Sequence, residues 1–300
     1  MNTTNPIGTN PIGINPTGLH LALLGGGNMA QALIQGLLRK PNQPLQLRRV
    51  TVVEPNETVR KQLLAQSEVL AQAAGIALNV LPLHAVDQGA QPPDWLLLAV
   101  KPQVAQTALR ELHAVRPEWL SGSVLLSIAA GLNTEKLSTW VGHPRIVRSM
   151  PNTPALIGRG ITGLFARGEV PEDRRLEAEH LLKSVGEVLW LEDEDLLDAV
   201  TAVSGSGPAY FFLLAEAMTQ AGVTLGLSAA QAALLARHTA AGAGMLMAQS
   251  EDSAETLRTR VTSPGGTTAA ALAVFEARGF RETVIAALEA ARNRGQALSR

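Results

Sequence analysis

The feature that most constrains the fold of this chain is a short apolar segment that runs directly into a glycine-rich loop. Leu19–Leu24 is almost entirely apolar, and the sequence Gly-Gly-Gly-Asn-Met-Ala follows it immediately. Leucines at helical spacing then continue as far as Leu38. A strand, a glycine turn and a helix in this order are typical of the first unit of a dinucleotide-binding α/β fold.

The loop matches the pattern G-x-G-x-x-G/A at Gly25, Gly27 and Ala30. In this pattern the first glycine permits the tight turn, the second lets a pyrophosphate approach the backbone, and the small third residue lets helix and strand pack closely. The helix start also presents N–H groups to the phosphates. An ordinary strand–helix turn is the alternative interpretation. The predicted cofactor-binding residues here are Leu24, Gly25, Gly26, Gly27, Asn28 and Met29.

Glu54 follows the second predicted strand, near the place where such folds carry an acidic residue for the ribose. A carboxylate there accepts hydrogen bonds from the 2′-hydroxyl of NADH and repels the 2′-phosphate of NADPH. It is also compatible with a merely exposed strand end, and Asn56 and Arg60 are close enough to complicate the choice. The cofactor is therefore predicted to be NADPH or NADH.

Apolar strand-like segments alternate with helical ones up to Glu194, and this order favours parallel pairing. The continuous run "WLLLAV" fits a sheet that is covered on both faces. Beyond the boundary that we place between Glu194 and Asp195, only helical patterns remain. The fold class is thus α/β: a Rossmann-like parallel-sheet domain at 19–194 and an all-α domain at 195–300. The predicted strands are 19–24, 50–53, 77–81, 95–100, 124–129, 145–150, 161–166 and 187–192, and the late helices are 208–221, 229–249, 267–278 and 280 to the end.

The late helices are rich in Ala, Gly, Leu and Met, and the segment "AAQAALLARHTAAGAGMLMA" has few polar positions on any face. A helix that is apolar nearly all round must be buried. A domain of this size can hardly bury several such helices alone, so burial between subunits is expected. A compact helical domain packed on the first domain is the alternative.

Composition excludes several classes of function. A net charge of −1 argues against nucleic-acid binding, and no uncharged apolar run is long enough to cross a membrane. The chain has no cysteine and its 6 histidines are scattered, so no metal site is predicted. Residues 1–18, with their repeated Asn-Pro-x-Gly units, are predicted to be a disordered tail. The chain shows no targeting signal, and a cytoplasmic location is expected.

Five further motifs lie where strands end or helices begin: "AVKPQV", "SIAAG", "RSMPNTPA", "SGSGPAY" and "SPGGTT". In this order and spacing they resemble the pyrroline-5-carboxylate reductase family over roughly residues 19–295. The resemblance implies a helical C-terminal dimerisation domain, often in a pentamer of dimers. It also implies hydride transfer from NAD(P)H to the C=N carbon of 1-pyrroline-5-carboxylate, which gives L-proline in the last step of proline biosynthesis.

The same resemblance implies roles for individual residues. Thr268 matches the residue whose hydroxyl hydrogen-bonds the ring nitrogen of the substrate, and it is the predicted catalytic residue. Glu251 matches a carboxylate near that nitrogen. The loop residues that match the cradle of the substrate carboxylate are Ser263, Gly266 and Thr267. The residues that match the nicotinamide end of the cofactor site are Val100, Lys101, Pro102 and Ala130.

These roles are chemically consistent, because hydride transfer needs no nucleophile or metal and the cofactor carries the chemistry. A glycine-containing helix start offers N–H groups to one carboxylate. Taken singly, each motif has a plainer interpretation: Lys101 as a solvated side chain, Ser263 as a helix cap. The alternative functions are reduction of another small cyclic imine or keto acid, or a non-catalytic dinucleotide-binding module. Many family members carry Ser or Thr where this chain has Glu54, which puts NADPH preference in doubt.

Overall fold

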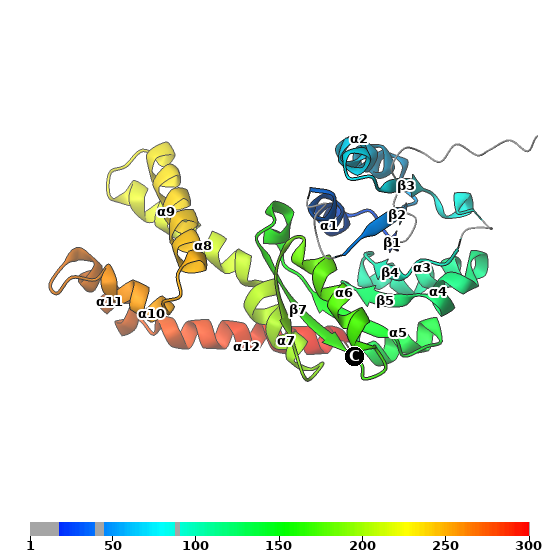
Figure 1. The fold of residues 1–300 in the computed structure, drawn as a ribbon. Helices are drawn as coiled ribbons and strands as arrows, with labels where there is room; N and C mark the ends of the chain where they lie inside the picture. The colour runs from blue at the N-terminus through cyan, green and yellow to red at the C-terminus, as the bar shows by residue number, and fades with distance from the viewer. Residues whose placement is uncertain (1–17, 40–44, 88–90, 300) are drawn as a thin grey trace, which may run out of the picture. The chain divides into compact units, whose positions relative to one another are not determined.

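The computed structural model describes residues 18–39, 45–87 and 91–299 (Figure 1). The chain forms two compact units: Met1–Thr201 together with Gly295–Arg300, and Ala202–Arg294. The domain boundary predicted after Glu194 stays a prediction, because a division into compact packing units does not define functional domains. Apart from Gly18, the predicted tail lies outside the described residues.

The first unit is built on an eight-stranded sheet with the order β3-β2-β1-β4-β5-β6-β7-β8. Six strands are parallel as predicted, but β7 runs antiparallel to β6, and β8 is parallel to β7. The prediction of parallel pairing throughout is wrong at β6–β7. Only the short helix η2 (Thr153–Ile157) joins these two strands, and a parallel crossover needs about a dozen residues or more. The strands are β1 Leu19–Leu24, β2 Leu47–Val53, β3 Ala77–Leu81, β4 Trp95–Leu98, β5 Val124–Ser127, β6 Ile146–Met150, β7 Gly160–Ala166 and β8 Gly186–Trp190.

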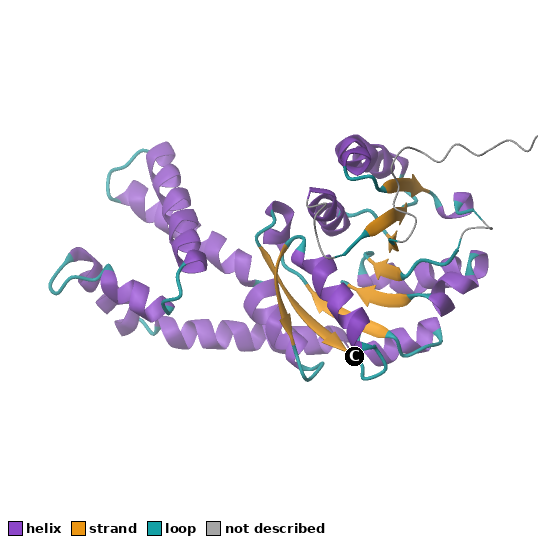
Figure 2. Ribbon diagram, viewed as in Figure 1, coloured by secondary structure: helices purple, strands orange, loops and turns teal. Residues whose placement is uncertain are grey.

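Helices cover both faces of this sheet (Figure 2). Side chains alternate across the strand, so Trp95 and Leu97 of β4 enter one core while Leu96 and Leu98 enter the other. The first core includes residues of α1, α2 and α6, and the second includes residues of α3, α4 and α5. The covering that "WLLLAV" predicts is therefore confirmed. The helices are α1 Asn28–Arg39, α2 Glu57–Ala73, α3 Pro102–Val115, α4 Pro117–Gly122, α5 Thr134–Val141, α6 Glu172–Lys183 and α7 Leu196–Val200; η1 is Leu83–Ala85.

The second unit is helical, and none of its described residues forms a strand, as predicted. Its helices expose many large apolar side chains: Phe212 of α8 is 70% exposed and Leu225, just after it, is 86% exposed. No helix among the described residues is long and apolar enough to cross a membrane. The elements are the π-helical turn η3 Thr201–Gly205, α8 Gly207–Thr224, α9 Ala229–Gln249, α10 Ala254–Arg260, α11 Thr267–Ala277 and α12 Phe280–Ser299. Thr201 of η3 and the residues of α12 from Gly295 on belong to the first unit.

Candidate functional site

The predicted cofactor residues of the first unit lie at one edge of the sheet, where the parallel strands end. Backbone hydrogen bonds continue past these ends: the N–H of Gly25 donates to the Val53 carbonyl over 2.9 Å, and that of Ala99 donates to Leu24 over 2.9 Å. The N–H of Ile128 likewise donates to the Leu98 carbonyl over 3.2 Å. The loops after β1, β4 and β5 are therefore fixed to neighbouring strands. In open α/β sheets, ligands bind outside this carboxyl edge.

Gly25 is required by both conformation and space. Its φ is +103°, a region that side chains rarely adopt. A Cβ atom placed on it would lie 2.8 Å from the carbonyl oxygen of Ala99 and 2.8 Å from Cγ1 of Val100. The structure thus brings Gly25 and Val100, two predicted cofactor residues, into direct contact.

The start of α1 is open to an anion. Gly27 and Asn28 are exposed, and a Cβ atom on Gly27 would meet nothing within 4 Å. The first N–H groups of a helix have no intrahelical acceptor, and the helix dipole is positive there. Leu24 before the loop is buried, and Met29 behind it packs against the core. The loop therefore has a rigid base and an accessible rim, which suits a pyrophosphate.

Glu54 holds the glycine loop in a way that sequence reasoning missed. Its Oε2 accepts a hydrogen bond from the N–H of Gly26 over 2.8 Å, and its Oε1 accepts one from Asn56 over 2.8 Å. Asn56 caps α2, so the carboxylate joins the first loop to the next helix. The guanidinium of Arg60 donates to the carbonyls of Glu54 over 2.9 Å and Pro55 over 2.6 Å. Hydrogen bonds to a charged carboxylate are strong, so this contact stiffens the loop.

The remaining predicted cofactor residues lie on the two following loops. Lys101 is exposed and precedes α3 as its N-cap, and Pro102 occupies the first turn of that helix. Ala130 is exposed in the turn after β5. Proline is favoured at a helix start because its missing N–H costs no hydrogen bond there. Because they follow β4 and β5, all three residues lie on the same edge of the sheet as the glycine loop.

The predicted substrate loop belongs to the second unit. Gly265 has a φ of +68°, and the N–H of Gly266 donates to the Ser263 carbonyl over 3.0 Å, which closes a tight turn. A Cβ atom on Gly266 would lie 2.5 Å from the Ser263 hydroxyl. Thr267 begins α11, and Thr268 beside it is half-buried. The turn thus places a serine hydroxyl next to a helix N-terminus, an arrangement that can bind one carboxylate.

Glu251 is exposed in the turn between α9 and α10. In the chain, helix α10 lies between Glu251 and the substrate loop, and the sequence prediction lacked this helix. At 1.5 Å per residue α10 is about 10 Å long. An ion pair from Asp252 to Arg260 joins the turn to the end of this helix. Ser253 caps α10 by accepting from the N–H of Thr256, and that cap was the available sequence signal.

A partly buried ion pair was also missed. The guanidinium of Arg148 on β6 donates to Glu194 over 3.0 Å, and the two side chains are 8% and 18% exposed. The same carboxylate accepts from the N–H of Thr134 over 2.7 Å and from its hydroxyl over 2.5 Å. A single arginine inside the apolar strand "IVRSM" was the available signal, because a buried charge requires a partner. The contact joins the start of α5 to the segment before α7.

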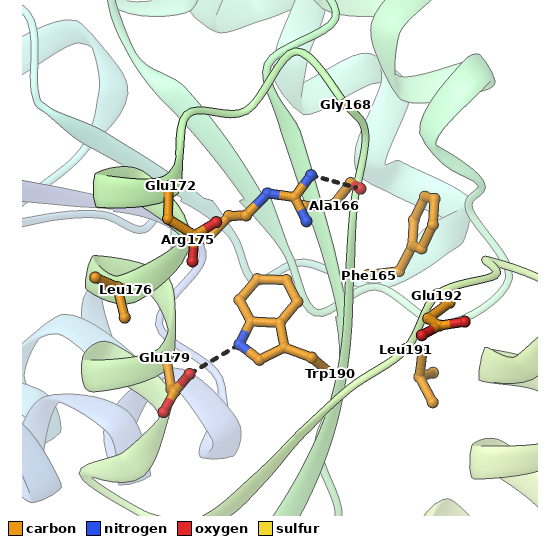
Figure 3. Close-up of a pocket in the computed structure, with 10 residues that line it drawn as sticks. All are labelled: Phe165, Ala166, Gly168, Glu172, Arg175, Leu176, Glu179, Trp190, Leu191 and Glu192. Carbon is orange, nitrogen blue, oxygen red and sulfur yellow. Dashed lines mark hydrogen bonds between the residues drawn. The ribbon is translucent and has the colours of Figure 1, made fainter.

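A cavity of about 670 Å³ opens elsewhere in the first unit, between α6 and the ends of β7 and β8 (Figure 3). Arg175 lies over the ring of Trp190 and donates to backbone carbonyls, and the indole N–H donates to Glu179 over 2.9 Å. The lining of this cavity contains none of the predicted site residues. Among the described residues, no group of three or more acidic or histidine side chains could hold a metal ion.

Comparisons with known proteins follow the division between sheet and helices. The profile of a family described as pyrroline-5-carboxylate reductase dimerisation matches residues 194–298. That of a family described as NADP oxidoreductase, coenzyme F420-dependent, matches residues 20–131.

Similarity to individual proteins extends over nearly the whole chain. A pyrroline-5-carboxylate reductase of Pseudomonas aeruginosa is 43% identical over 281 residues, which are 93% of this chain and 96% of that protein. The solved reductase of Coxiella burnetii has a TM-score of 0.79 at 36% identity and covers 94% of this chain and 99% of its own. That of Plasmodium falciparum, solved with NADP bound, has a TM-score of 0.73 at 29% identity and covers 94% and 98%.

Proposed function

This chain belongs to the pyrroline-5-carboxylate reductase family, and we propose that it transfers a hydride from NAD(P)H to 1-pyrroline-5-carboxylate, forming L-proline. The structural observation that carries the cofactor half of this function is the dinucleotide loop, and the family membership carries the choice of substrate. Gly25 is packed where no side chain fits, Glu54 holds Gly26, and the open start of α1 follows. The reaction is the last step of proline biosynthesis, as the family resemblance predicts.

The residues present fit the cofactor. The rim at Gly27 and Asn28 would offer N–H groups to the pyrophosphate. The residues that would line the nicotinamide end follow β4 and β5 at the same sheet edge: Val100, Lys101, Pro102 and Ala130. When bound, NAD(P)H supplies the hydride. The chain itself must hold the substrate and exclude competing reactions.

We assign the substrate to the loop at the start of α11. The N–H groups there and the Ser263 hydroxyl would bind the carboxylate, with Gly266 and Thr267 shaping the cradle. Thr268 would hydrogen-bond the imine nitrogen through its hydroxyl, and Glu251 would lie near that nitrogen. A threonine hydroxyl is too weak an acid to protonate the nitrogen itself, so Thr268 orients an iminium that is already protonated or receives its proton from solvent.

Glu54 bears on the choice of cofactor. Its carboxylate lies at the loop that binds the adenosine half in such folds, and a 2′-phosphate there would meet like charge. We therefore propose that the enzyme uses NADH at least as well as NADPH. The test is kcat/KM for both cofactors, and a preference for NADPH above about tenfold, or about 1.4 kcal/mol, would overturn the proposal.

The protein is also proposed to work as a homodimer, within a pentamer of dimers. Support comes from the dimerisation profile over residues 194–298 and from the apolar side chains that α8 exposes. Such patches mark interfaces in stable proteins. Analytical ultracentrifugation would distinguish monomer, dimer and decamer. A cytoplasmic location belongs to the same proposal, and cell fractionation tests it.

The central experiment is turnover. Purified protein with 1-pyrroline-5-carboxylate should oxidise NADH or NADPH and form L-proline in equal amount, measured by absorbance and chiral chromatography. Turnover only with another cyclic imine or a keto acid would point to a different reductase. Cofactor binding without any oxidation would point to a non-catalytic dinucleotide-binding module.

A further inference from the structure

The last turn of the chain packs against the loop that carries Ala130. Helix α12 runs through Ser299, and its residues from Gly295 on belong to the first unit. A Cβ atom placed on Gly131 would lie 3.3 Å from the carbonyl oxygen of Leu298, 3.5 Å from its carbonyl carbon and 3.7 Å from its Cβ. The contact is therefore made mainly by the Leu298 backbone, while much of the leucine side chain stays exposed.

Glycines stand on both sides of this contact. Gly131 has a φ of +75°, so its conformation and its close neighbour both disfavour a side chain. Gly295 lies inside α12, where a Cβ would come 3.5 Å from Oδ1 of Asp198 on α7. Glycine weakens a helix interior, and a Cβ at this distance would make an ordinary van der Waals contact with Asp198. The end of α12 thus contacts both α7 and the loop after β5.

The other end of that loop is held by the partly buried ion pair of Arg148 and Glu194. Thr134, the first residue of α5, donates through its N–H and its hydroxyl to Glu194, which also pairs with Arg148. The loop from Ile128 to Asn133 is consequently fixed at three places. These are the Leu98 carbonyl, which accepts from the N–H of Ile128, the Leu298 backbone, and the Glu194 carboxylate.

We propose that the C-terminal turn of α12 is a positioning element for the nicotinamide half of the cofactor site. By packing its Leu298 backbone on Gly131, it holds the exposed Ala130 beside the cofactor. The inference rests on the proposed function, because it assigns Ala130 to the cofactor. Helix α12 begins in the second unit, and by this proposal its last residues support the cofactor site of the first unit.

Deletion of residues 298–300 tests the proposal, with Leu298→Ala as its matched control. The deletion removes the backbone contact, whereas Leu298→Ala keeps the carbonyl and the Cβ. We expect the deletion to raise the Kd and KM for NADH about fivefold or more, with a smaller change in kcat. Amide hydrogen exchange in the segment 128–134 should quicken in the same variant. Leu298→Ala should behave as the wild type in all four measurements.

A second pair of variants guards against a general loss of folding. Gly131→Ala and Gly142→Ala impose nearly the same strain, because their φ values are +75° and +77°. Only Gly131 has α12 beside it; a Cβ on Gly142 would meet nothing within 4 Å. Gly131→Ala should therefore raise the Kd for NADH, and Gly142→Ala should lower the melting temperature without doing so.

The proposal fails if the deletion leaves NADH affinity unchanged, whether or not exchange quickens. It also fails if Gly131→Ala and Gly142→Ala alter NADH affinity equally. NADH affinity and hydrogen exchange are measured without substrate. A wild-type protein that binds NADH but does not reduce 1-pyrroline-5-carboxylate would refute the proposed function and leave this test interpretable.

Discussion

Two glycine-containing turns open helices in this protein, and they are supported very differently. The turn at Gly25 is tied to neighbouring strands and to the Glu54 carboxylate, all within the first unit. The turn at Gly266 has mainly local contacts, such as the hydrogen bond to Ser263, and lies in a unit whose apolar side chains are widely exposed. The first turn is therefore complete within one chain, while we expect the second to acquire its working environment in the assembled protein.

The largest effect should come from breaking the assembly. Phe212→Glu places a charge on an exposed apolar face of α8, and burying that charge in an interface is unfavourable. We expect dissociation by sedimentation velocity and a fall in kcat/KM of at least ~100-fold, or about 3 kcal/mol. NADH affinity should change little, because the first turn is built within one chain.

The matched control is Val69→Glu on α2, where the valine is 75% exposed in the first unit. It should leave both sedimentation and kcat/KM at wild-type values. If Phe212→Glu still sediments as the wild type does, this face of α8 is not an interface, and the difference between the two turns does not come from assembly.

A smaller effect is expected from the second turn itself. Thr268→Ala removes the hydroxyl proposed to contact the imine nitrogen, and kcat/KM should fall by roughly 100-fold, with NADH affinity unchanged. Thr268→Ser keeps the donor and should be milder. As a control, Thr224→Ala removes a hydroxyl that donates to the Gln220 carbonyl within α8 and should have no effect on steady-state kinetics. Normal turnover by Thr268→Ala would remove the threonine from the mechanism.

The first turn should respond to Glu54→Gln. The substitution removes a charge and one acceptor, so the repulsion of a 2′-phosphate should weaken and Gly26 should be held less firmly. The ratio of kcat/KM for NADPH to that for NADH should rise by about tenfold. The control is Glu57→Gln, which removes an exposed carboxylate that pairs with Lys61 on α2 and should leave the ratio unchanged. An equal ratio in both variants would separate Glu54 from cofactor choice.

The smallest effect on catalysis is expected from His20, near the amino end of β1, but its effect on the free energy of unfolding should be measurable. Burial, aided by the charges of Arg49 and Arg48, lowers the pKa of His20 from 6.5 to about 4, against the opposing effect of Asp94. Between those pH values the unfolded chain binds more protons, so stability is lost as pH falls from about 6.5 to about 4. The loss is at most about 3 kcal/mol.

Urea unfolding at pH 7 and pH 5 measures this dependence. His20→Gln should flatten it, whereas His84→Gln, at an exposed position, should not. An unchanged pH dependence in His20→Gln would show that other groups cause the acid sensitivity.

Local patterns predicted much of the first unit. Apolar runs identified its eight strands, and the glycine pattern placed the loop before α1. The sequence did not predict the reversal at β7, because pairing direction depends on whether a crossover fits between strands. It also missed α10, whose cap at Ser253 is a weak local signal.

In the site, residue types and spacing identified the candidate residues, but not their partners. Nothing near Glu54 in the sequence indicates that its carboxylate reaches Gly26. The pairing of Arg148 with Glu194 and the packing of Leu298 on Gly131 likewise join residues far apart in the chain. Such contacts depend on the fold as a whole, since they form only after the intervening strands and helices have been placed.

The sequence by itself determined the class of fold, the glycine loop, the helical second part and the resemblance that names the reaction. The first three follow from patterns within a few residues, where periodicity and backbone freedom act directly, and the resemblance follows from the order of short motifs along the chain. The tertiary structure alone decided that Glu54 braces the glycine loop and that the end of α12 lies against Gly131. Both depend on close packing between distant segments, which local propensity does not encode.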